Sequence, residues 1–133
     1  MAARGRLVQI PADLVEFFWP LAEPWLRQAE HRIGCASPED FRKRLLNAEC
    51  DLWLIYAGEV VAASAVTSVR GKTITVEALG GDGIDWRALL ADLEHLAREH
   101  GKTNLEIQGR PGWARLFRDD GYRTTYVTIR KAL

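Results

Sequence analysis

The feature that most restricts the fold of this chain is a series of three β-rich segments within residues 51–79. These are DLWLIYA (51–57), VVAASAVTSV (60–69) and KTITVEAL (72–79), and they are rich in β-branched and aromatic residues. Only two-residue separators that contain glycine join them, and such separators favour tight hairpin turns. The pattern predicts a three-stranded antiparallel meander.

A helix and another strand are expected after the meander, over residues 85–100 and 104–109. The helical segment has five apolar residues on one stripe, namely Leu89, Leu90, Leu93, Leu96 and Ala97. Asp85 is placed to cap this helix, and Gly101 is placed to end it. A strand–helix–strand crossover is right-handed and makes its two strands parallel. The predicted sheet is therefore mixed, although most of its strand pairs are antiparallel.

The segments before the meander favour one strand and two helices. Residues 6–10 (RLVQI) form a short apolar strand candidate, and residues 11–33 show apolar residues at helical spacing. Pro20 and Pro24 are expected to kink or split that helix. A second helix is expected over residues 37–49, because Ser37 can cap it and Asp40 lies three residues later.

The C-terminal part predicts a short helix over residues 112–120 and a final strand over residues 122–133. The whole chain, residues 1–133, is then one α/β (α+β) domain with the order β-α-α-β-β-β-α-β-α-β. We expect helices on both faces of the sheet.

Charge and cysteine content narrow the range of functions. The chain carries 18 basic and 18 acidic side chains, whereas general nucleic-acid binding and membrane-surface binding need a basic excess. No apolar run approaches the length of a membrane span, and the N-terminus lacks a signal-peptide core. Cys35 and Cys50 fit no common zinc pattern with His31, so we expect free thiols, no metal site and a cytoplasmic location.

The element order, at this length, resembles the GNAT (Gcn5-related N-acetyltransferase) fold over nearly the whole chain. In that family acetyl-coenzyme A enters between the fourth and fifth strands. Its pyrophosphate lies on a glycine-containing loop before the next helix, which matches GGDGID (80–85) here. The resemblance implies that backbone N–H groups of Gly81, Gly83 and Ile84 would hold the pyrophosphate, with Arg87 offsetting charge. It also implies Glu77, at the end of the fourth strand, as the candidate general base. The alternative for Glu77 is a solvent-facing strand residue without a catalytic role.

Several residues depart from the GNAT pattern. Gly80 stands where the family has Gln or Arg, and Asp85 stands where it has Gly or Ala. Asp82 adds a second negative charge to the loop. Phe117 matches the position of the tyrosine that protonates the departing thiolate in many GNAT enzymes, while Tyr122 matches a core aromatic residue. The loop is therefore either a cofactor cradle or a plain turn followed by an aspartate helix cap.

The C-terminal sequence also resembles small GNAT-like proteins encoded by tailed phages and prophages. The resemblance rests on nine residues: Gly109, Arg110, Gly112, Trp113, Arg115, Gly121, Tyr122, Lys131 and Leu133. Trp86 and Trp113 open the two helices next to the expected cofactor entrance. They could plug that cleft, pack in the core, or anchor a partner protein together with Arg110. Core packing is the favoured interpretation for Trp53.

Two hypotheses follow from these residues. The first is a GNAT-fold protein with a degenerate acetyl-coenzyme A loop, which needs no cofactor and serves as a structural or interaction component of a phage particle or its assembly. Its partners would be other proteins, including phage structural proteins or further copies of itself, and it could reside in the virion. The alternative is an active N-acetyltransferase that transfers the acetyl group of acetyl-coenzyme A to a primary amine.

Overall fold

The computed structural model describes residues 2–33, 37–109, 111–127 and 129–133. The main elements of this part of the chain are β1 (Arg6–Ile10), α1 (Val15–Ile33), α2 (Pro38–Leu46), β2 (Asp51–Ala57), β3 (Val60–Arg70), β4 (Thr73–Gly81), α3 (Trp86–Glu99), β5 (Asn104–Ile107) and α4 (Pro111–Phe117). Short 3-10 helices precede α1 and follow α4, at Ala12–Leu14 and Arg118–Asp120.

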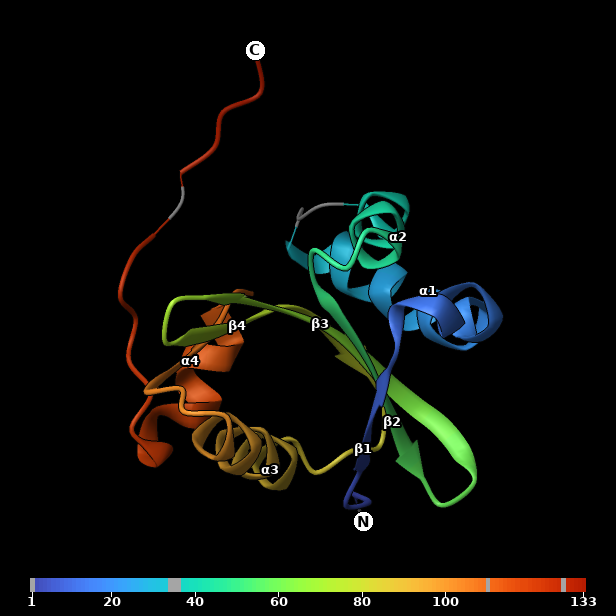
Figure 1. Cartoon of the computed structure of the whole chain (residues 1–133). Helices are drawn as coiled ribbons and strands as arrows, with labels where there is room; N and C mark the ends of the chain where they lie inside the picture. Colours follow the sequence, from blue (N-terminus) through green and yellow to red (C-terminus); the bar gives the residue numbers. More distant parts are fainter. Residues whose placement is uncertain (1, 34–36, 110, 128) are drawn as a thin grey trace.

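The described strands form one five-stranded sheet in the order β1-β2-β3-β4-β5 (Figure 1). Neighbouring strands are antiparallel except for β4 and β5, which are parallel. The predicted meander and mixed sheet are thus confirmed. A bulge interrupts the β3–β4 pairing, because Val66 pairs with Ala78 while Thr67 pairs with Val76. Glu77 is the extra residue of this bulge.

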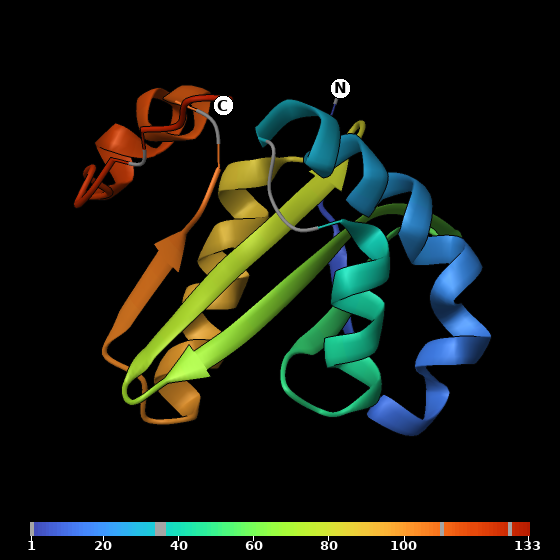
Figure 2. The ribbon, with the colours of Figure 1, turned by 90° about the horizontal axis from the view of Figure 1, so that it is seen from above.

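Helices cover both faces of the sheet, as predicted. Figures 1 and 2 show α1 and α2 on one face and α3 and α4 on the other. Each helical layer closes over its own buried cluster. The larger residues under α1 and α2 are Trp19, Leu26, Phe41, Leu45, Leu52, Leu54 and Val66. Those on the other face are Ile55, Val76, Leu79, Leu89, Leu90, Leu93 and Phe117.

Helix α1 is continuous in spite of its two internal prolines, Pro20 and Pro24. Of the two expected effects of the prolines, a kink or a split, the structure contradicts the split. The helix is held by a buried stripe at helical spacing, formed by Val15, Trp19, Ala22, Leu26 and Ala29. Packing of this stripe on the sheet outweighs the loss of backbone hydrogen bonds at the prolines, because helices in proteins are stabilised mainly by their buried face.

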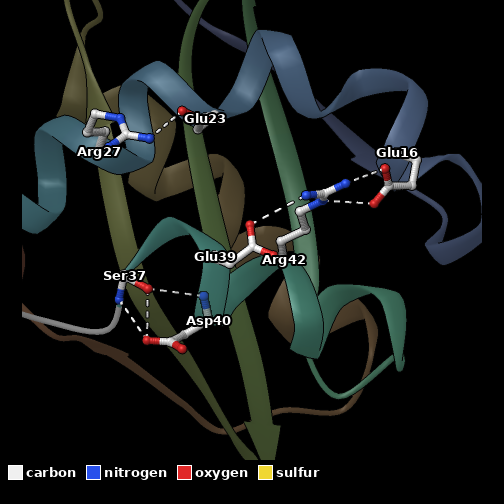
Figure 3. Close-up of polar contacts among 7 residues, drawn as sticks. All are labelled: Glu16, Glu23, Arg27, Ser37, Glu39, Asp40 and Arg42. Carbon is white, nitrogen blue, oxygen red and sulfur yellow. Dashed lines mark hydrogen bonds and ion pairs between the residues drawn. The ribbon is translucent and has the colours of Figure 1, made fainter.

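Polar contacts fix the start of α2 and join it to α1 (Figure 3). Ser37 and Asp40 form the predicted cap as a reciprocal capping box, in which each side chain accepts from the other residue's backbone N–H at 3.2 Å. The Arg42 guanidinium donates to both carboxylate oxygens of Glu16, at 2.8 and 2.6 Å. It also contacts Glu39 at 3.4 Å.

The prediction of a final strand over residues 122–133 is wrong. Residues 122–127 and 129–133 form no strand and pair with no part of the described sheet. They leave the body beside α4 and extend away from it (Figure 1). The alternating sequence identified a segment able to form a strand, but pairing also needs an available edge in the right orientation. In the structure the tail does not turn along β5.

Candidate functional site

The loop between β4 and α3 is shorter than the sequence suggested. Gly80 and Gly81 belong to β4, so the expected strand end at Leu79 is wrong. A Cβ on Gly80 would lie 2.1 Å from the Trp25 carbonyl oxygen, and a Cβ on Gly81 would lie 2.3 Å from the Ala63 Cβ. These two glycines are therefore required by close packing against α1 and β3.

The N-terminal segment holds the rest of the loop. The Ala3 N–H donates to the Gly83 carbonyl at 2.8 Å, and the Asp85 N–H donates to the Ala3 carbonyl at 2.8 Å. Gly83 has φ +71°, a left-handed conformation that glycine adopts without strain. Ile84 is buried, with 4% of its surface exposed. The loop is thus a fixed turn tied to residues at the start of the chain.

Several N–H groups that could meet a phosphate already have acceptors. The Gly81 N–H donates to Gln28 Oε1 at 2.9 Å, and the Asp82 N–H donates to the Ala62 carbonyl at 3.0 Å. The Asp85 carboxylate accepts from the Ala88 N–H at 3.1 Å, which confirms the predicted helix cap.

Other N–H groups in the same loop remain open. Within the part of the chain that the structure describes, the N–H groups of Gly83, Ile84 and Trp86 have no hydrogen-bond acceptor. They lie at the N-terminal end of α3, where the helix dipole favours an anion. The Asp85 carboxylate already lies at that helix end, so a second anion would meet a like charge.

Arg87 does not turn toward the loop. Its guanidinium forms a two-pronged ion pair with Asp120, with Nε–Oδ2 and Nη2–Oδ1 distances of 2.9 Å each. This pair raises the pKa of Arg87 and lowers that of the Asp120 carboxyl. The contact joins the first turn of α3 to the 3-10 helix after α4. The cation expected to offset the loop's carboxylates is therefore committed elsewhere.

Strands β4 and β5 separate next to this loop. Their parallel pairing covers only Thr73–Val76 and Asn104–Ile107, and the last bond of the ladder runs from the Gln108 N–H to the Val76 carbonyl at 2.9 Å. The remainder of β4, from Glu77 to Gly81, has no β5 partner. Figure 2 shows the two strands running side by side at one end and α4 lying beyond the other.

The candidate base, Glu77, lies in a partly buried ion pair. Arg44 of α2 donates to both of its carboxylate oxygens, at 2.9 and 2.7 Å, and the Glu77 side chain is 17% exposed. The hydrogen bonds from Arg44 hold the pKa of Glu77 below its ordinary value. The residue is neither a solvent-facing strand residue nor an open carboxylate. A lowered pKa and a fixed cation both oppose proton abstraction from an amine.

The position of the general acid holds no proton donor. Phe117 is 1% exposed and stacks on Trp113, with ring centroids 5.5 Å apart. Tyr122 is half-buried and packs against Phe117, as predicted for a core aromatic residue. Its hydroxyl donates to Glu94 at 2.8 Å, and burial together with this contact raises the pKa of Tyr122. The Tyr122 proton is thus held by a carboxylate of α3.

The two tryptophans beside the strand opening pack against each other. Trp86 and Trp113 meet edge to face with centroids 5.5 Å apart, and both are half-buried against the core. A Cβ on Gly109 would lie 2.5 Å from the Trp113 ring, so glycine is needed there. Trp53 is also half-buried, and its indole N–H donates to Thr67 at 2.9 Å. Arg110, the third proposed interaction residue, lies outside the described residues.

The described residues show neither a metal-ligand cluster nor a membrane-spanning helix. Among the described residues, no group of three or more His, Cys, Asp or Glu side chains could hold a metal ion. None of the described helices has the length and apolar character needed to cross a bilayer. Cys50 is a buried free thiol, and burial raises its pKa to about 11. Cys35 lies outside the described residues.

Solved structures of acetyltransferases share this fold along almost their entire length. A ribosomal-protein-alanine N-acetyltransferase from Brucella melitensis biovar Abortus 2308 has a TM-score of 0.68 at 10% identity, covering 97% of this chain and 99% of the other. An aminoglycoside acetyltransferase from an uncultured soil metagenomic sample, in complex with trehalose, has a TM-score of 0.65 at 12% identity, covering 97% and 96%. The aminoglycoside N-acetyltransferase AAC(6')-Iy in complex with CoA has a TM-score of 0.62 at 12% identity, covering 100% and 97%.

The protein therefore has the GNAT acetyltransferase fold. No family model matches the sequence, and no curated protein matches it at a significant level. At identities this low the likeness establishes the fold alone. Function has to be argued from the residues of the site.

Three partners of the site were not visible in the sequence. Ala3 holds the loop, Gln28 occupies the Gly81 N–H, and Arg44 neutralises Glu77. Each acts on a residue at least 33 positions away in the chain. No local pattern marks such contacts, and only the basic character of the run FRKR (41–44) hinted that α2 carries cations.

Proposed function

We propose that this protein is a GNAT-fold component without acetyltransferase activity, acting through protein–protein contacts in a phage particle or in its assembly. The observation that carries the proposal is the Asp85 carboxylate bound to the Ala88 N–H at the start of α3. A pyrophosphate would need that same helix end. The GNAT-like phage proteins that the C-terminal sequence resembles support the biological setting.

The charge of Asp85 opposes a phosphate strongly. Two like charges 4 Å apart repel by about 4 kcal/mol at an effective dielectric constant near 20, which is a hundredfold or more in affinity. Asp82 is exposed in the same loop and adds to the effect. Arg87, the nearby cation of α3, is already paired with Asp120.

The residues at the positions of the general base and general acid also support a protein without acetyltransferase activity. Glu77 is neutralised by Arg44, and Phe117 has no ionisable group. Tyr122 donates its proton to Glu94. An acetyl transfer would have to proceed without any of these three side chains accepting the amine proton or protonating the thiolate.

The proposed contact surface is the region where α3 and α4 begin, which carries Trp86 and Trp113. Arg110, which directly precedes α4 in the sequence, is the third proposed contact residue. Half-buried tryptophans that are fixed by their neighbours can anchor a partner at little entropic cost. We propose capsid or tail proteins as partners, in the cytoplasm during assembly or in the finished virion. Co-expression with such proteins followed by pull-down tests this, and Trp86→Ala should weaken a capture that Trp53→Ala leaves intact.

Calorimetric titration with acetyl-coenzyme A tests the central claim. We expect no measurable binding by the native chain. In the variant Asp82→Asn/Asp85→Ser, serine keeps the helix cap while both charges are removed, so binding should appear or strengthen at least tenfold. Asp13→Asn, which removes one carboxylate far from the loop, is the matched control. A micromolar dissociation constant for the native chain would refute the proposal.

The second candidate function is an active N-acetyltransferase. It is favoured by the open N–H groups of Gly83, Ile84 and Trp86 and by the separation of β4 from β5. In this case the amides of Gly83 and Ile84 would hold the pyrophosphate, with Gly81 contributing only if Gln28 moves away. Glu77 would steer a water as base, and solvent would protonate the thiolate.

A thiol-release assay over a broad set of primary amines separates the two functions. The non-catalytic proposal predicts no release above the rate without protein. Turnover of any amine that Asp85→Ser increases and Glu77→Gln abolishes would establish the alternative.

A further inference from the structure

Helix α1 carries two apolar stripes, although a helix on the surface of a protein typically shows only one. The first stripe, from Val15 to Ala29, is buried on the sheet. The second consists of Leu14, Phe17, Leu21 and Pro24, and its first residue lies in the 3-10 turn that leads into α1. Leu14, Phe17 and Leu21 are 43, 77 and 46% exposed, and Pro24 is also exposed. We call these four residues the α1 seam.

The spacing of the α1 seam is that of a helix–helix contact. Its members follow one another at intervals of three, four and three residues, which is the pattern by which paired helices pack along a common line. Phe17, the most exposed member, meets Phe18 edge to face with ring centroids 5.0 Å apart. Phe18 is itself packed against the core. Phe17 is therefore held in place, and a side chain fixed in advance loses little entropy on binding.

The exposed fractions show that no element in the described part of the chain covers the α1 seam. Helix α2 flanks α1 on another side, where Arg42 donates to Glu16 (Figure 3). In Figure 2, α1 lies at the margin of the body. A continuous apolar row on the outside of a folded chain marks a contact surface.

The α1 seam is complementary to itself when two copies of α1 run antiparallel. Such a pair places Phe17 of one copy opposite Leu21 of the other, and Leu14 opposite Pro24. Each larger side chain then meets a smaller one, so the two rows can interdigitate as paired helices do.

The charges beside the seam fit the same arrangement. Asp13 borders one end of the seam and Arg27 borders the other, on the same flank. In an antiparallel pair, Asp13 of one copy therefore meets Arg27 of the other, whereas a parallel pair brings like charges together at each end. Among the described residues the exposed Asp13 carboxylate has no ion-pair partner. The Arg27 guanidinium is 59% exposed and binds Glu23, and its five N–H donors suffice for a second carboxylate.

We propose that the α1 seam is the interface of a homodimer, in which two copies of α1 pack antiparallel about a twofold axis. Such an interface uses every contact twice, so the seam residues of both copies lie between two Asp13–Arg27 pairs. It involves one helix face from each copy, which places it among the small interfaces of less than about 1,200 Å². We expect a dissociation constant in the micromolar range. The inference depends neither on acetyl-coenzyme A binding nor on the surface around Trp86 and Trp113.

Sedimentation velocity at protein concentrations from about 1 µM to about 0.3 mM, which span a micromolar dissociation constant, tests the interface. The native chain, of 15.0 kDa, should shift from monomer to dimer. Leu21→Asp places a charge in the seam and should stay monomeric throughout. Leu116→Asp is the matched control, because Leu116 is 43% exposed on α4, on the other face of the sheet, and should still dimerise.

Both leucines are exposed, so both variants should remain folded, which urea unfolding checks. A native chain that stays monomeric overturns the proposal and leaves the α1 seam to a helix of another protein. A dimer that survives Leu21→Asp, or that Leu116→Asp also abolishes, overturns it as well.

Charge reversal tests the antiparallel arrangement. Asp13→Arg should weaken the dimer about tenfold, because it opposes Arg27 at both ends of the interface. Asp13→Arg/Arg27→Glu restores opposite charges and should recover most of that loss. If the single variant dimerises like the native chain, or the double variant is no better than the single one, the antiparallel pairing is refuted.

Disulfide trapping gives an independent measurement. In a background with Cys35→Ser and Cys50→Ala, one chain carries Phe17→Cys and a second, size-tagged chain carries Leu21→Cys. These positions face each other in the antiparallel pair, within reach of a disulfide, so we expect a mixed covalent dimer on oxidation. Leu14→Cys alone is the control, because its two copies lie about 15 Å apart along antiparallel helices and should not cross-link. Cross-linking of Leu14→Cys in place of the mixed dimer would show a parallel pair and refute the proposal.

Discussion

The two helical layers close their faces of the sheet by different means. On the α1/α2 face, ion pairs to Glu16 and Glu77 join the elements around a buried apolar cluster. On the α3/α4 face, a series of aromatic rings in contact and the Arg87–Asp120 ion pair join the elements. Open N–H groups and a tail without a strand partner remain on this side. The α1/α2 layer thus stabilises the GNAT fold and also holds the candidate base, Glu77, in an ion pair with Arg44. The second layer holds the groups through which this protein can still bind something.

The largest loss of stability is expected from a substitution at the contact between α1 and β4, on the face of the sheet that α1 and α2 cover. Gly80→Ala places a Cβ 2.1 Å from the Trp25 carbonyl oxygen, and the backbone of α1 must move to relieve the overlap. We expect the free energy of unfolding, measured in urea, to fall by about 3 kcal/mol. Gly112→Ala adds the same methyl group where no atom lies within 4 Å, so it should be neutral or slightly stabilising. Equal losses for both variants would contradict this account of Gly80.

The next largest effect is expected at Arg44. Arg44→Met keeps an apolar side chain of similar length but leaves the 17% exposed Glu77 carboxylate without its cation. We expect a loss of about 2 kcal/mol at pH 7, less than for a fully buried pair because both side chains keep some contact with water. Adding Glu77→Gln should recover part of the loss, since no charge is then left unpaired.

This pair also predicts a pH dependence. Arg44 lowers the pKa of Glu77 in the folded state, so its stabilisation is complete above the pKa of the unfolded chain, near 4.5. It is lost as the pH falls through the lowered folded-state pKa. The stability difference between the native chain and Arg44→Met should therefore shrink as the pH falls below about 4. A difference that stays constant from pH 7 to pH 3 would show that Arg44 acts by packing alone.

Features with a local cause were predictable from the sequence. The meander, the stripe of α3, the capping box at Ser37 and the Asp85 cap each depend on residues a few positions apart. The order of elements was enough to suggest the GNAT fold. Such features are set by backbone preferences and by the spacing of apolar residues, both of which can be read along the chain.

Features set by distant contacts were not predictable. Gly80 looked like a loop glycine but serves the approach of α1, and Glu77 looked solvent-facing but meets Arg44. The prediction of a final strand was wrong for a related reason. The alternation of apolar and polar residues in 122–133 indicates that a strand can form, but it does not indicate which sheet edge the strand joins. In the candidate site, the sequence identified the carboxylate at the helix end but not its neighbours.

A smaller effect separates the two roles of Asp85. As a helix cap, its loss in Asp85→Ala should lower the free energy of unfolding by about 1 kcal/mol. Asp85→Ser keeps a capping oxygen and should retain most of that stability while losing the charge. Thermal or urea unfolding of the two variants measures the cap alone. If both are equally destabilised, the carboxylate stabilises α3 through its charge rather than through the Ala88 N–H.

The smallest expected change in the free energy of unfolding is at Tyr122. Its ring contacts Phe117, and its hydroxyl donates to Glu94 of α3. Tyr122→Phe removes the hydrogen bond to Glu94, and the loss should be below about 1 kcal/mol because the partly exposed carboxylate can bind water instead. The pKa of Tyr122 is raised in the folded state, by burial first and by Glu94 second. Its contribution is therefore complete below the ordinary tyrosine pKa near 10 and falls as the pH rises above that value.

The native chain should accordingly lose stability above about pH 10 more steeply than Tyr122→Phe does. Tyr126→Phe is the matched control, because it removes one tyrosine hydroxyl from a ring that is 59% exposed. Urea unfolding between pH 8 and about pH 11 measures both slopes. If Tyr122→Phe keeps the native slope, the Tyr122 hydroxyl is not held by Glu94 in solution. The α3/α4 face would then lack the Tyr122–Glu94 hydrogen bond, and the Tyr122 hydroxyl would be free to donate to a bound ligand.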